Sequence, residues 1–230
     1  MAVCELVIFD CDGTLMDSEP LAAEVETDTL REYGIEMDVK EFALRFAGTS
    51  SQHVKTVMEE ESGRSFPDDH FQKLKLKFHE KLWREVKAVD GAHELLDALD
   101  QPRCVCSNAD MEKLKIELSR AELWDRFRPY IFSAEDIEGV AKKPAPDIFL
   151  HAAKEFDTDP AACTVVEDSA SGVAAGKAAG MRVIGFVGAS HTYPGHADQL
   201  TEAGAETVVK HLRDIPAVIE AFGLWEGADA

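Results

Sequence analysis

The sequence is short of basic residues. Its 230 residues include 24 Lys and Arg against 44 Asp and Glu, which gives a formal net charge of -20 at pH 7. A chain of this charge repels the phosphates of nucleic acids and anionic lipids, and no local basic patch offsets that effect. We therefore expect neither a nucleic acid nor a membrane surface among its partners.

Long apolar runs and paired cysteines are also missing. No run approaches the length that spans a membrane, and the first apolar stretch carries Glu5 and leads directly into Asp10, unlike a signal peptide. The five cysteines are an odd number and lie in or beside apolar runs, without the spacing of a zinc site. These features predict reduced core thiols and a cytoplasmic protein.

Apolar runs of the kind found in buried parallel strands alternate with helix-like stretches. The runs cover residues 6–9, 104–106, 164–166 and 183–187, and residues 169–179 between the last two have helical character. This alternation is typical of an α/β fold with a doubly wound, Rossmann-like parallel sheet. The length, too short for two ordinary domains, favours one main domain with a smaller insert.

Residues 16–87 have a different pattern. Phe71, Leu74, Phe78 and Leu82 recur at helical spacing, and the segment contains no convincing strand. Glycine-containing breaks near residues 34, 48–51 and 63–67 divide it into about four helices. We expect a core domain of residues 1–15 and 88–230 and an all-helical inserted domain of residues 16–87.

Polar residues follow three of the predicted strands. Asp10-Cys11-Asp12-Gly13-Thr14 follows the first, Ser107-Asn108 the second and Glu167-Asp168 the third. In an open parallel sheet, ligands bind beyond the carboxyl ends of the strands. The sequence therefore predicts that these groups converge on one crevice.

The spacing of Asp10 and Asp12 suits covalent hydrolysis. Two residues apart at a strand end, both side chains can start on one face, so that one carboxylate attacks while its neighbour transfers protons. When a carboxylate attacks a phosphate, two anions come together and repel each other by roughly 4 kcal/mol at 4 Å in a moderately screened site. Asp168 and Asp10 together offer oxygen ligands for a hard ion that would offset this repulsion, and Mg²⁺ is the natural choice.

Lys143 and the pair Ser107 and Asn108 complete the set. Lys143 precedes Pro144 and can bridge the nucleophile and a phosphate, while Ser107 and Asn108 stand at a strand-to-helix junction that can receive phosphate oxygens. Each element alone has a simpler interpretation as a turn, a helix cap or a solvated surface charge. Their joint occurrence at the ends of separate strands favours function.

These residues resemble the motifs of the haloacid dehalogenase superfamily of phosphohydrolases, in order and over nearly the whole chain. Residues 10–14 are similar to its first motif, Ser107 to its second, Lys143 to its third and Glu167-Asp168 to its fourth. The resemblance implies Asp10 as nucleophile, Asp12 as general acid and base, and Ser107 and Lys143 as phosphate binders. It also implies magnesium held by Asp10, the Asp12 carbonyl and Asp168, with Glu167 in support, and a helical insert that closes over the crevice as a cap.

Three chemistries compete within this superfamily. The dehalogenases lack an aspartate two residues after the nucleophile, so Asp12 argues against cleavage of carbon–halogen bonds. Mutases of the β-phosphoglucomutase type carry a histidine where Ala22 stands and an arginine where Ser51 stands. Both departures favour a phosphatase over a mutase, and the chain is most similar to phosphatases of sugar phosphates and sugar-acid phosphates, a branch that includes 6-phosphogluconate phosphatases.

Substrate contacts are expected from the inserted domain. We assign them to Arg45, Gly48, Thr49, Ser51 and Lys75, although a solvated helix face explains these residues equally well. For His191 and His196, which follow the strand at 183–187, we favour loop packing over a role in the site. The expected assembly is a monomer or a small homo-oligomer that binds a small phosphoester.

Two non-enzymatic alternatives stay open. A receiver-like phosphorylation switch also uses an acidic pocket, a hydroxyl and a lysine, but such receivers have no helical insert after the first strand. A catalytically idle relative that only binds metabolites is harder to exclude, although every catalytic position is filled.

Overall fold

The chain divides into two compact units. The computed structural model describes residues 4–46 and 49–225. One unit comprises Met1–Asp17 and Lys87–Ala230, and the other comprises Ser18–Val86.

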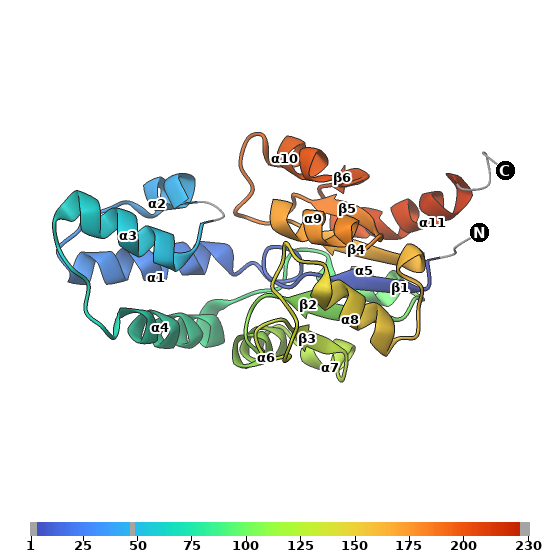
Figure 1. Ribbon diagram of the computed structural model, residues 1–230, viewed down its shortest axis with the longest axis horizontal. Helices are drawn as coiled ribbons and strands as arrows, with labels where there is room; N and C mark the ends of the chain where they lie inside the picture. Colours follow the sequence, from blue (N-terminus) through green and yellow to red (C-terminus); the bar gives the residue numbers. More distant parts are fainter. Residues whose placement is uncertain (1–3, 47–48, 226–230) are drawn as a thin grey trace. The chain divides into compact units, whose positions relative to one another are not determined.

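The larger unit is built on a six-stranded parallel sheet (Figure 1). The strand order is β3-β2-β1-β4-β5-β6. The strands are β1 (Leu6–Phe9), β2 (Arg103–Ser107), β3 (Ile131–Ser133), β4 (Cys163–Glu167), β5 (Arg182–Phe186) and β6 (Thr207–Val209). Phe9 is in register with Val105 of β2 and with Val166 of β4, so the carboxyl ends of these three strands lie within two residues of one another at the same edge of the sheet. The predicted doubly wound α/β sheet is confirmed.

Helices connect the strands and cover both faces of the sheet. They are α5 (Ala92–Ala98), α6 (Met111–Arg120), α7 (Trp124–Phe127), α8 (Asp147–Glu155), α9 (Ala170–Ala178), α10 (His196–Ala203) and α11 (Ile215–Trp225), with 3₁₀ segments at Pro160–Ala162 and Leu212–Asp214. Of these, α6 follows β2 and α9 follows β4, so each begins at the edge of the sheet where the polar motifs end.

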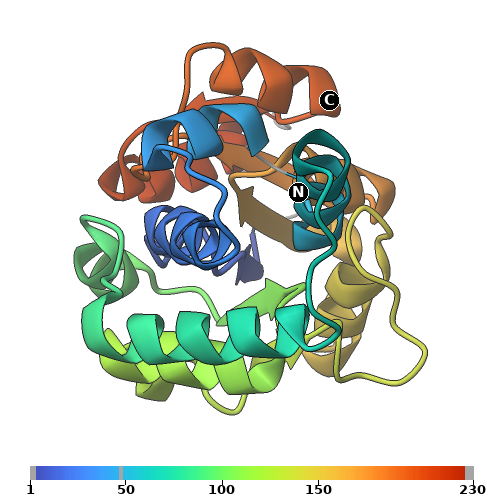
Figure 2. The ribbon, with the colours of Figure 1, turned by 90° about the vertical axis from the view of Figure 1, so that its left-hand side faces the viewer.

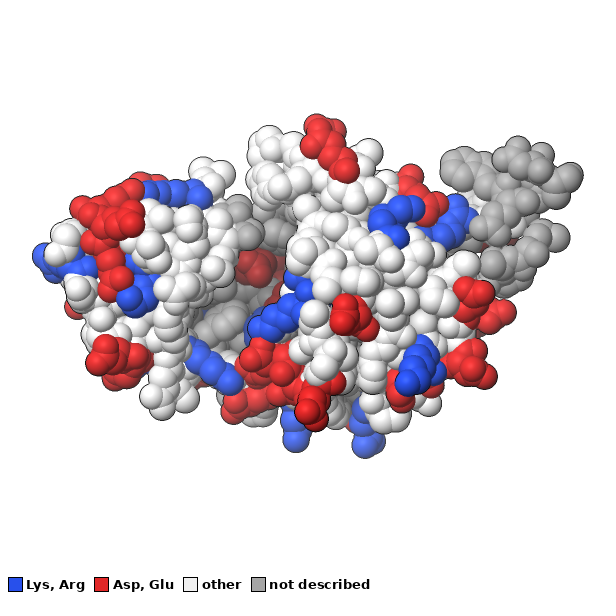
Figure 3. Space-filling model, in the orientation of Figure 1, with Lys and Arg blue, Asp and Glu red and all other residues white. Residues whose placement is uncertain are grey.

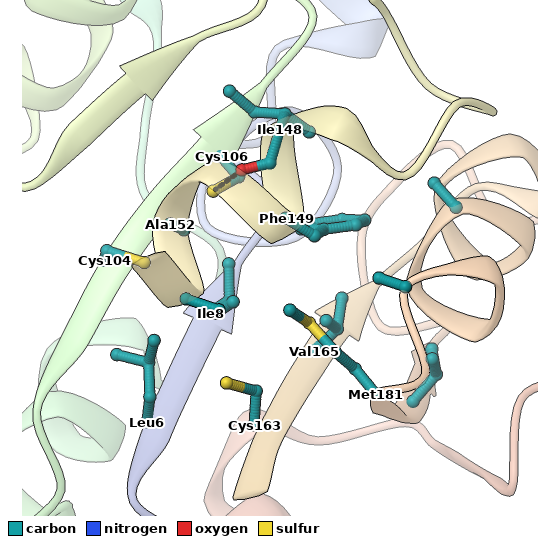
Figure 4. Close-up of a cluster of buried hydrophobic side chains, with 14 of the residues drawn as sticks. Leu6, Ile8, Cys104, Cys106, Ile148, Phe149, Ala152, Cys163, Val165 and Met181 are labelled. Atoms are coloured by element: carbon teal, nitrogen blue, oxygen red, sulfur yellow. Dashed lines mark hydrogen bonds between the residues drawn. The ribbon is translucent and has the colours of Figure 1, made fainter. Parts of the chain in front are cut away.

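The core of this unit lies on both sides of β1. Because successive side chains of a strand alternate between faces, Leu6 and Ile8 point to one face and Val7 and Phe9 to the other, and all four are fully buried. Figure 4 shows the Leu6 and Ile8 face, which packs against cysteines of β2 and β4 and against side chains of α8. On the opposite face, the ring of Phe9 meets the edge of Phe127 at a centroid distance of 6.0 Å. The central strands are thus buried on both sides, as a parallel sheet requires.

The second unit consists of helices in its described residues. These are α1 (Glu19–Glu32), α2 (Val39–Phe46), α3 (Ser51–Ser62) and α4 (His70–Glu85), drawn in blue to green in Figures 1 and 2. Its core gathers Ala23, Leu30, Phe42, Phe46, Val54, Met58 and Phe66. The Ser50 side chain caps α3 by accepting the His53 N–H at 3.2 Å, and Gly63 ends this helix at φ +64°.

Charge on the surface is mixed. On the face shown in Figure 3, acidic side chains gather at several places, with basic side chains set among them. All five cysteines carry free thiols, and four of them are buried, which confirms the prediction of core thiols. A helix with the length and apolarity to cross a membrane does not occur within residues 4–46 and 49–225.

Candidate active site

Asp10 and Asp12 lie in the loop directly beyond β1. The Asp10 N–H donates to Val166 O at 3.0 Å, which extends the pairing of β1 with β4 and fixes the start of the loop. Gly13 then turns the chain at φ +76°. A Cβ atom at this position would lie 2.1 Å from Asp168 Oδ2, so only glycine allows the loop to approach the end of β4 so closely.

Lys143 links three strand ends. Its ammonium donates to Asp10 Oδ1 at 2.6 Å, to Cys106 O at 2.7 Å and to Glu167 Oε1 at 2.5 Å. These acceptors belong to the ends of β1, β2 and β4, and the Lys143 side chain is almost fully buried. The structure therefore brings together the lysine and the two acidic motifs that the sequence separates by more than a hundred residues.

Asn108 holds the backbone of Lys143. The Asn108 side chain accepts the Lys143 N–H at 2.8 Å and donates to the Lys143 carbonyl at 3.2 Å. One N–H of the amide and its oxygen are used in this way, so the Asn108 side chain fixes the Lys143 backbone. Ser107 is buried, and its hydroxyl accepts the Ala109 N–H at 3.0 Å.

Asp168 and Glu167 end β4 with different partners. Thr14 Oγ1 lies 3.4 Å from Asp168 Oδ1, across the loop that follows β1. The second oxygen of Glu167 accepts from Ser169 N at 3.2 Å and from Ser169 Oγ at 3.0 Å, which ties it to the start of α9. Glu167 thus uses one oxygen for Lys143 and the other for the helix start.

The cluster carries an excess of negative charge. Burial raises the pKa of Asp10 well above its ordinary value, the neighbouring carboxylates of Glu167, Asp168 and Asp12 raise it further, and the Lys143 ammonium opposes the rise. Burial by itself would lower the pKa of Lys143, but Asp10 and Glu167 hold it above its ordinary value. The Lys143 ammonium thus faces several carboxylates in a largely buried site.

A divalent cation fits this charge balance. Oxygens of Asp10, Glu167 and Asp168 lie within 4.8 Å of one another. All are hard ligands, which Mg²⁺ prefers, and a cation here would offset the mutual repulsion of the carboxylates. Of these three, Asp10 and Asp168 are the side-chain ligands that the sequence analysis assigned, and that assignment stays a prediction.

A second acidic and basic group lies beside Asp12, and sequence reasoning missed it. The ammonium of Lys113, on α6, contacts Asp12 Oδ1 and lies 3.1 Å from Glu117 Oε1. Cys11 Sγ lies 3.6 Å from the other Glu117 oxygen. Burial raises the pKa of Glu117 to about 8, the Asp12 carboxylate adds to the rise, and Lys113 opposes it.

His191 and His196 both contact Asp168, which the sequence analysis did not predict when it favoured loop packing. His191 Nε2 lies 3.0 Å from Asp168 Oδ2, and His196 Nε2 donates to the Asp168 carbonyl at 2.7 Å. The ring of Tyr193 stacks on His196 at 4.6 Å. The loop after β5 therefore holds both the side chain and the backbone of Asp168.

The residues proposed to contact substrate lie in the helical unit. Arg45, in the last turn of α2, pairs with Glu61 of α3, and Thr49 Oγ1 donates to Phe46 O at 2.8 Å. Ser51 is the first residue of α3, and Lys75 is exposed on α4. Gly48 lies outside the described residues. Their role toward a ligand stays a prediction.

A family model and three known proteins match this chain. The model described as haloacid dehalogenase-like hydrolase matches residues 7–186. A curated relative, 6-phosphogluconate phosphatase of Escherichia coli (strain K12), is 30% identical over 227 residues, which cover 98% of this chain and 99% of the relative.

Two solved structures resemble the chain along nearly its full length. A conserved haloacid dehalogenase-like protein of unknown function from Agrobacterium tumefaciens is 46% identical with a TM-score of 0.87, and the match covers 95% of this chain and 99% of that one. A haloacid dehalogenase family hydrolase from Deinococcus radiodurans R1, with bound phosphate and sodium, is 31% identical with a TM-score of 0.83, over 97% of this chain and 98% of that one.

Proposed function

This chain belongs to the haloacid dehalogenase-like hydrolase family, and we propose that it is a magnesium-dependent phosphatase of a small phosphorylated metabolite that works through an aspartyl-phosphate on Asp10. The broader statement, that it is an enzyme hydrolysing phosphoesters, follows from its likeness to named phosphatases of this family. The observation that carries the finer proposal is the bridge from Lys143 to Asp10 and Glu167 beside Asp168.

In the first half of the reaction, an Asp10 oxygen attacks the phosphorus atom and the bond from phosphorus to the ester oxygen breaks. Asp12 gives its proton to that oxygen, which leaves as an alcohol. The ammonium of Lys143 touches Asp10 Oδ1, where it can also meet a phosphate oxygen and reduce the repulsion between the two anions. Ser107, at the end of β2, is proposed to bind another phosphate oxygen.

In the second half, water attacks the same phosphorus atom and the bond to Asp10 breaks. The Asp12 carboxylate accepts the proton of the attacking water, which returns both aspartates to their starting forms. A magnesium ion held by Asp10, Asp168 and the Asp12 carbonyl would supply positive charge against the phosphoryl oxygens. Burial of the cluster keeps bulk water away from these groups, so that their charges act strongly on the phosphate.

For the substrate, we propose a sugar phosphate or a sugar-acid phosphate. The activity for which the E. coli relative is named, 6-phosphogluconate phosphatase, supports this class. Residues 18–86 would act as a cap, with Arg45, Thr49, Ser51 and Lys75 toward the leaving group. The free thiols support the proposal that the enzyme works in the reducing cytoplasm.

The proposal is tested by a panel of phosphomonoesters that includes sugar phosphates, sugar-acid phosphates and simple alkyl phosphates. We expect phosphate release from a subset of the panel with Mg²⁺, a loss of about a hundredfold or more when EDTA removes it, and recovery on adding Mg²⁺ back. Release is measured as inorganic phosphate. If no ester is hydrolysed but some raise the melting temperature, the chain is a metabolite-binding protein.

His191 is expected to support metal binding through Asp168. Mutation of a residue that hydrogen-bonds to a metal ligand typically lowers metal affinity by about 10- to 100-fold, so His191→Ala should weaken Mg²⁺ affinity by that factor. Titration calorimetry with Mg²⁺ and no substrate measures this directly. His211→Ala, at an exposed position of the same unit, is the control and should bind Mg²⁺ as the unmodified chain does. If both variants bind Mg²⁺ with equal affinity, His191 does not support metal binding.

A further inference from the structure

Each aspartate of the first motif has its own lysine, and each lysine has its own buried glutamate. Lys143 joins Asp10 to Glu167 in the cluster described above. Lys113 joins Asp12 to Glu117 in the same way, with 3.1 Å between Lys113 Nζ and Glu117 Oε1. The first group belongs to the proposed chemistry, and the second has no role in it so far.

The second group is not placed to stabilise α6. Asp110 caps this helix by accepting the Lys113 N–H at 2.9 Å, so Lys113 stands in the first turn, where its charge opposes the helix dipole. Glu117 follows four residues later, and this lysine-before-glutamate order is the weaker one for a helix pair. A helix selected for stability alone would favour the opposite arrangement.

Burial adds a further cost. The Glu117 side chain has no exposed surface, and those of Lys113 and Asp12 are only 15% and 20% exposed. Charges withdrawn from water are costly unless their partners are well placed, so a buried ion pair is weak evidence for a stabilising role. The cluster therefore calls for another explanation.

The geometry explains the cluster as a tether for the side chain of Asp12. Glu117 cannot move, because it is enclosed by the core and also contacts Cys11. It holds the Lys113 ammonium from one side, and the ammonium contacts Asp12 Oδ1 on the other. Catalysis by proton transfer requires the acid within hydrogen-bond reach of the reacting oxygen, so a tethered carboxylate is an advantage.

We propose that Lys113, held by Glu117, is a positioning residue that fixes the Asp12 carboxylate for proton transfer to the leaving group and from the attacking water. This inference rests on the proposed function. It adds two residues of α6 to the machinery, neither of which belongs to the recognised motifs.

The test compares two kinds of ester. An alkyl phosphate releases an alkoxide that needs a proton, whereas 4-nitrophenyl phosphate releases a stable anion that needs none. We expect Lys113→Met to slow phospho-enzyme formation from the alkyl ester by about 100-fold and from the aryl ester by no more than about threefold. Breakdown of the phospho-enzyme should slow equally for both. Rapid-quench kinetics separates these steps, and Lys113→Arg should restore much of the rate.

Matched variants decide between positioning and general damage. Lys115→Met changes an exposed lysine of the same helix and should leave all rates unchanged. Lys113→Met/Glu117→Gln avoids a lone buried charge, and it should show the same selective loss on the alkyl ester. In an Asp12→Asn background, Lys113→Met should add less than about a twofold effect, because both changes remove one function.

The outcomes are distinguishable. If the unmodified chain hydrolyses no phosphomonoester of the panel, the proposed function itself fails and the inference fails with it. If the unmodified chain is active but Lys113→Met slows both esters alike, or slows Asp12→Asn further, the positioning role is wrong while the phosphatase proposal stands.

Discussion

Asp10→Asn is expected to lower turnover by at least about four orders of magnitude, because an amide oxygen cannot act as the nucleophile in place of the carboxylate. Asp10 directly follows β1 and accepts a hydrogen bond from Lys143 at 2.6 Å, which would place its carboxylate beside a phosphate that Lys143 holds. Acid quenching with a labelled ester should trap a phospho-enzyme in the unmodified chain and none in this variant.

The variant should still fold. Repulsion by Glu167, Asp168 and Asp12 is relieved when Asp10 becomes neutral, while Lys143 keeps Glu167 and the Cys106 carbonyl as partners. The free energy of unfolding should therefore change by less than about 1.5 kcal/mol. Asp100→Asn, at an exposed position of the same unit, is the matched control and should keep full activity. Normal hydrolysis by Asp10→Asn would exclude Asp10 as the nucleophile.

Lys143→Met is expected to lower the free energy of unfolding by about 3–5 kcal/mol, because it leaves buried carboxylates without their ammonium partner. Asp10 and Glu167 both accept hydrogen bonds from this lysine, and their side chains are only 11% and 0% exposed. Lys142→Met is a matched control, since Lys142 is 54% exposed and pairs with Glu135 on the surface. Lys142→Met should lower the free energy of unfolding by no more than about 0.5 kcal/mol.

Urea unfolding in the presence of EDTA measures both variants. Adding Mg²⁺ should reduce the difference in unfolding free energy between the two variants, because a bound cation offsets part of the negative charge that Lys143→Met leaves unpaired. Lys143→Met/Glu167→Gln should recover part of the lost stability, since it removes one of the two unpaired carboxylates. Equal stability of Lys143→Met and Lys142→Met would mean that the buried bridge contributes nothing to the fold.

Most strands of the sheet could be predicted from the local hydrophobic pattern of the sequence. The predicted strand at residues 6–9 coincides with β1, and the predictions for β2, β4 and β5 differ from the structure by one residue at each end. The strands β3 and β6 were not identified. Each has three residues, too few to show a periodicity, and each exists through its pairing with β2 or β5.

The site was predictable as far as it depends on strand ends. Polar residues that directly follow buried strands of one parallel sheet must meet at one edge, so Asp10, Ser107 and Asp168 could be grouped without coordinates. The partner of each side chain could not be predicted in this way. The bonds between the Asn108 side chain and the Lys143 backbone, for example, have no signal in the sequence, and the role of Asn108 toward a phosphate stays a prediction.

The amino-acid sequence by itself predicted four of the six strands, the helical insert and the polar groups beyond the strand ends, because hydrophobic periodicity and turn residues act over short distances. Only the tertiary structure decided that Lys113 contacts an aspartate 101 residues away and that His191 reaches Asp168. Such contacts depend on how a helix and a loop pack against the sheet, and that packing is a property of the whole core that local patterns do not record.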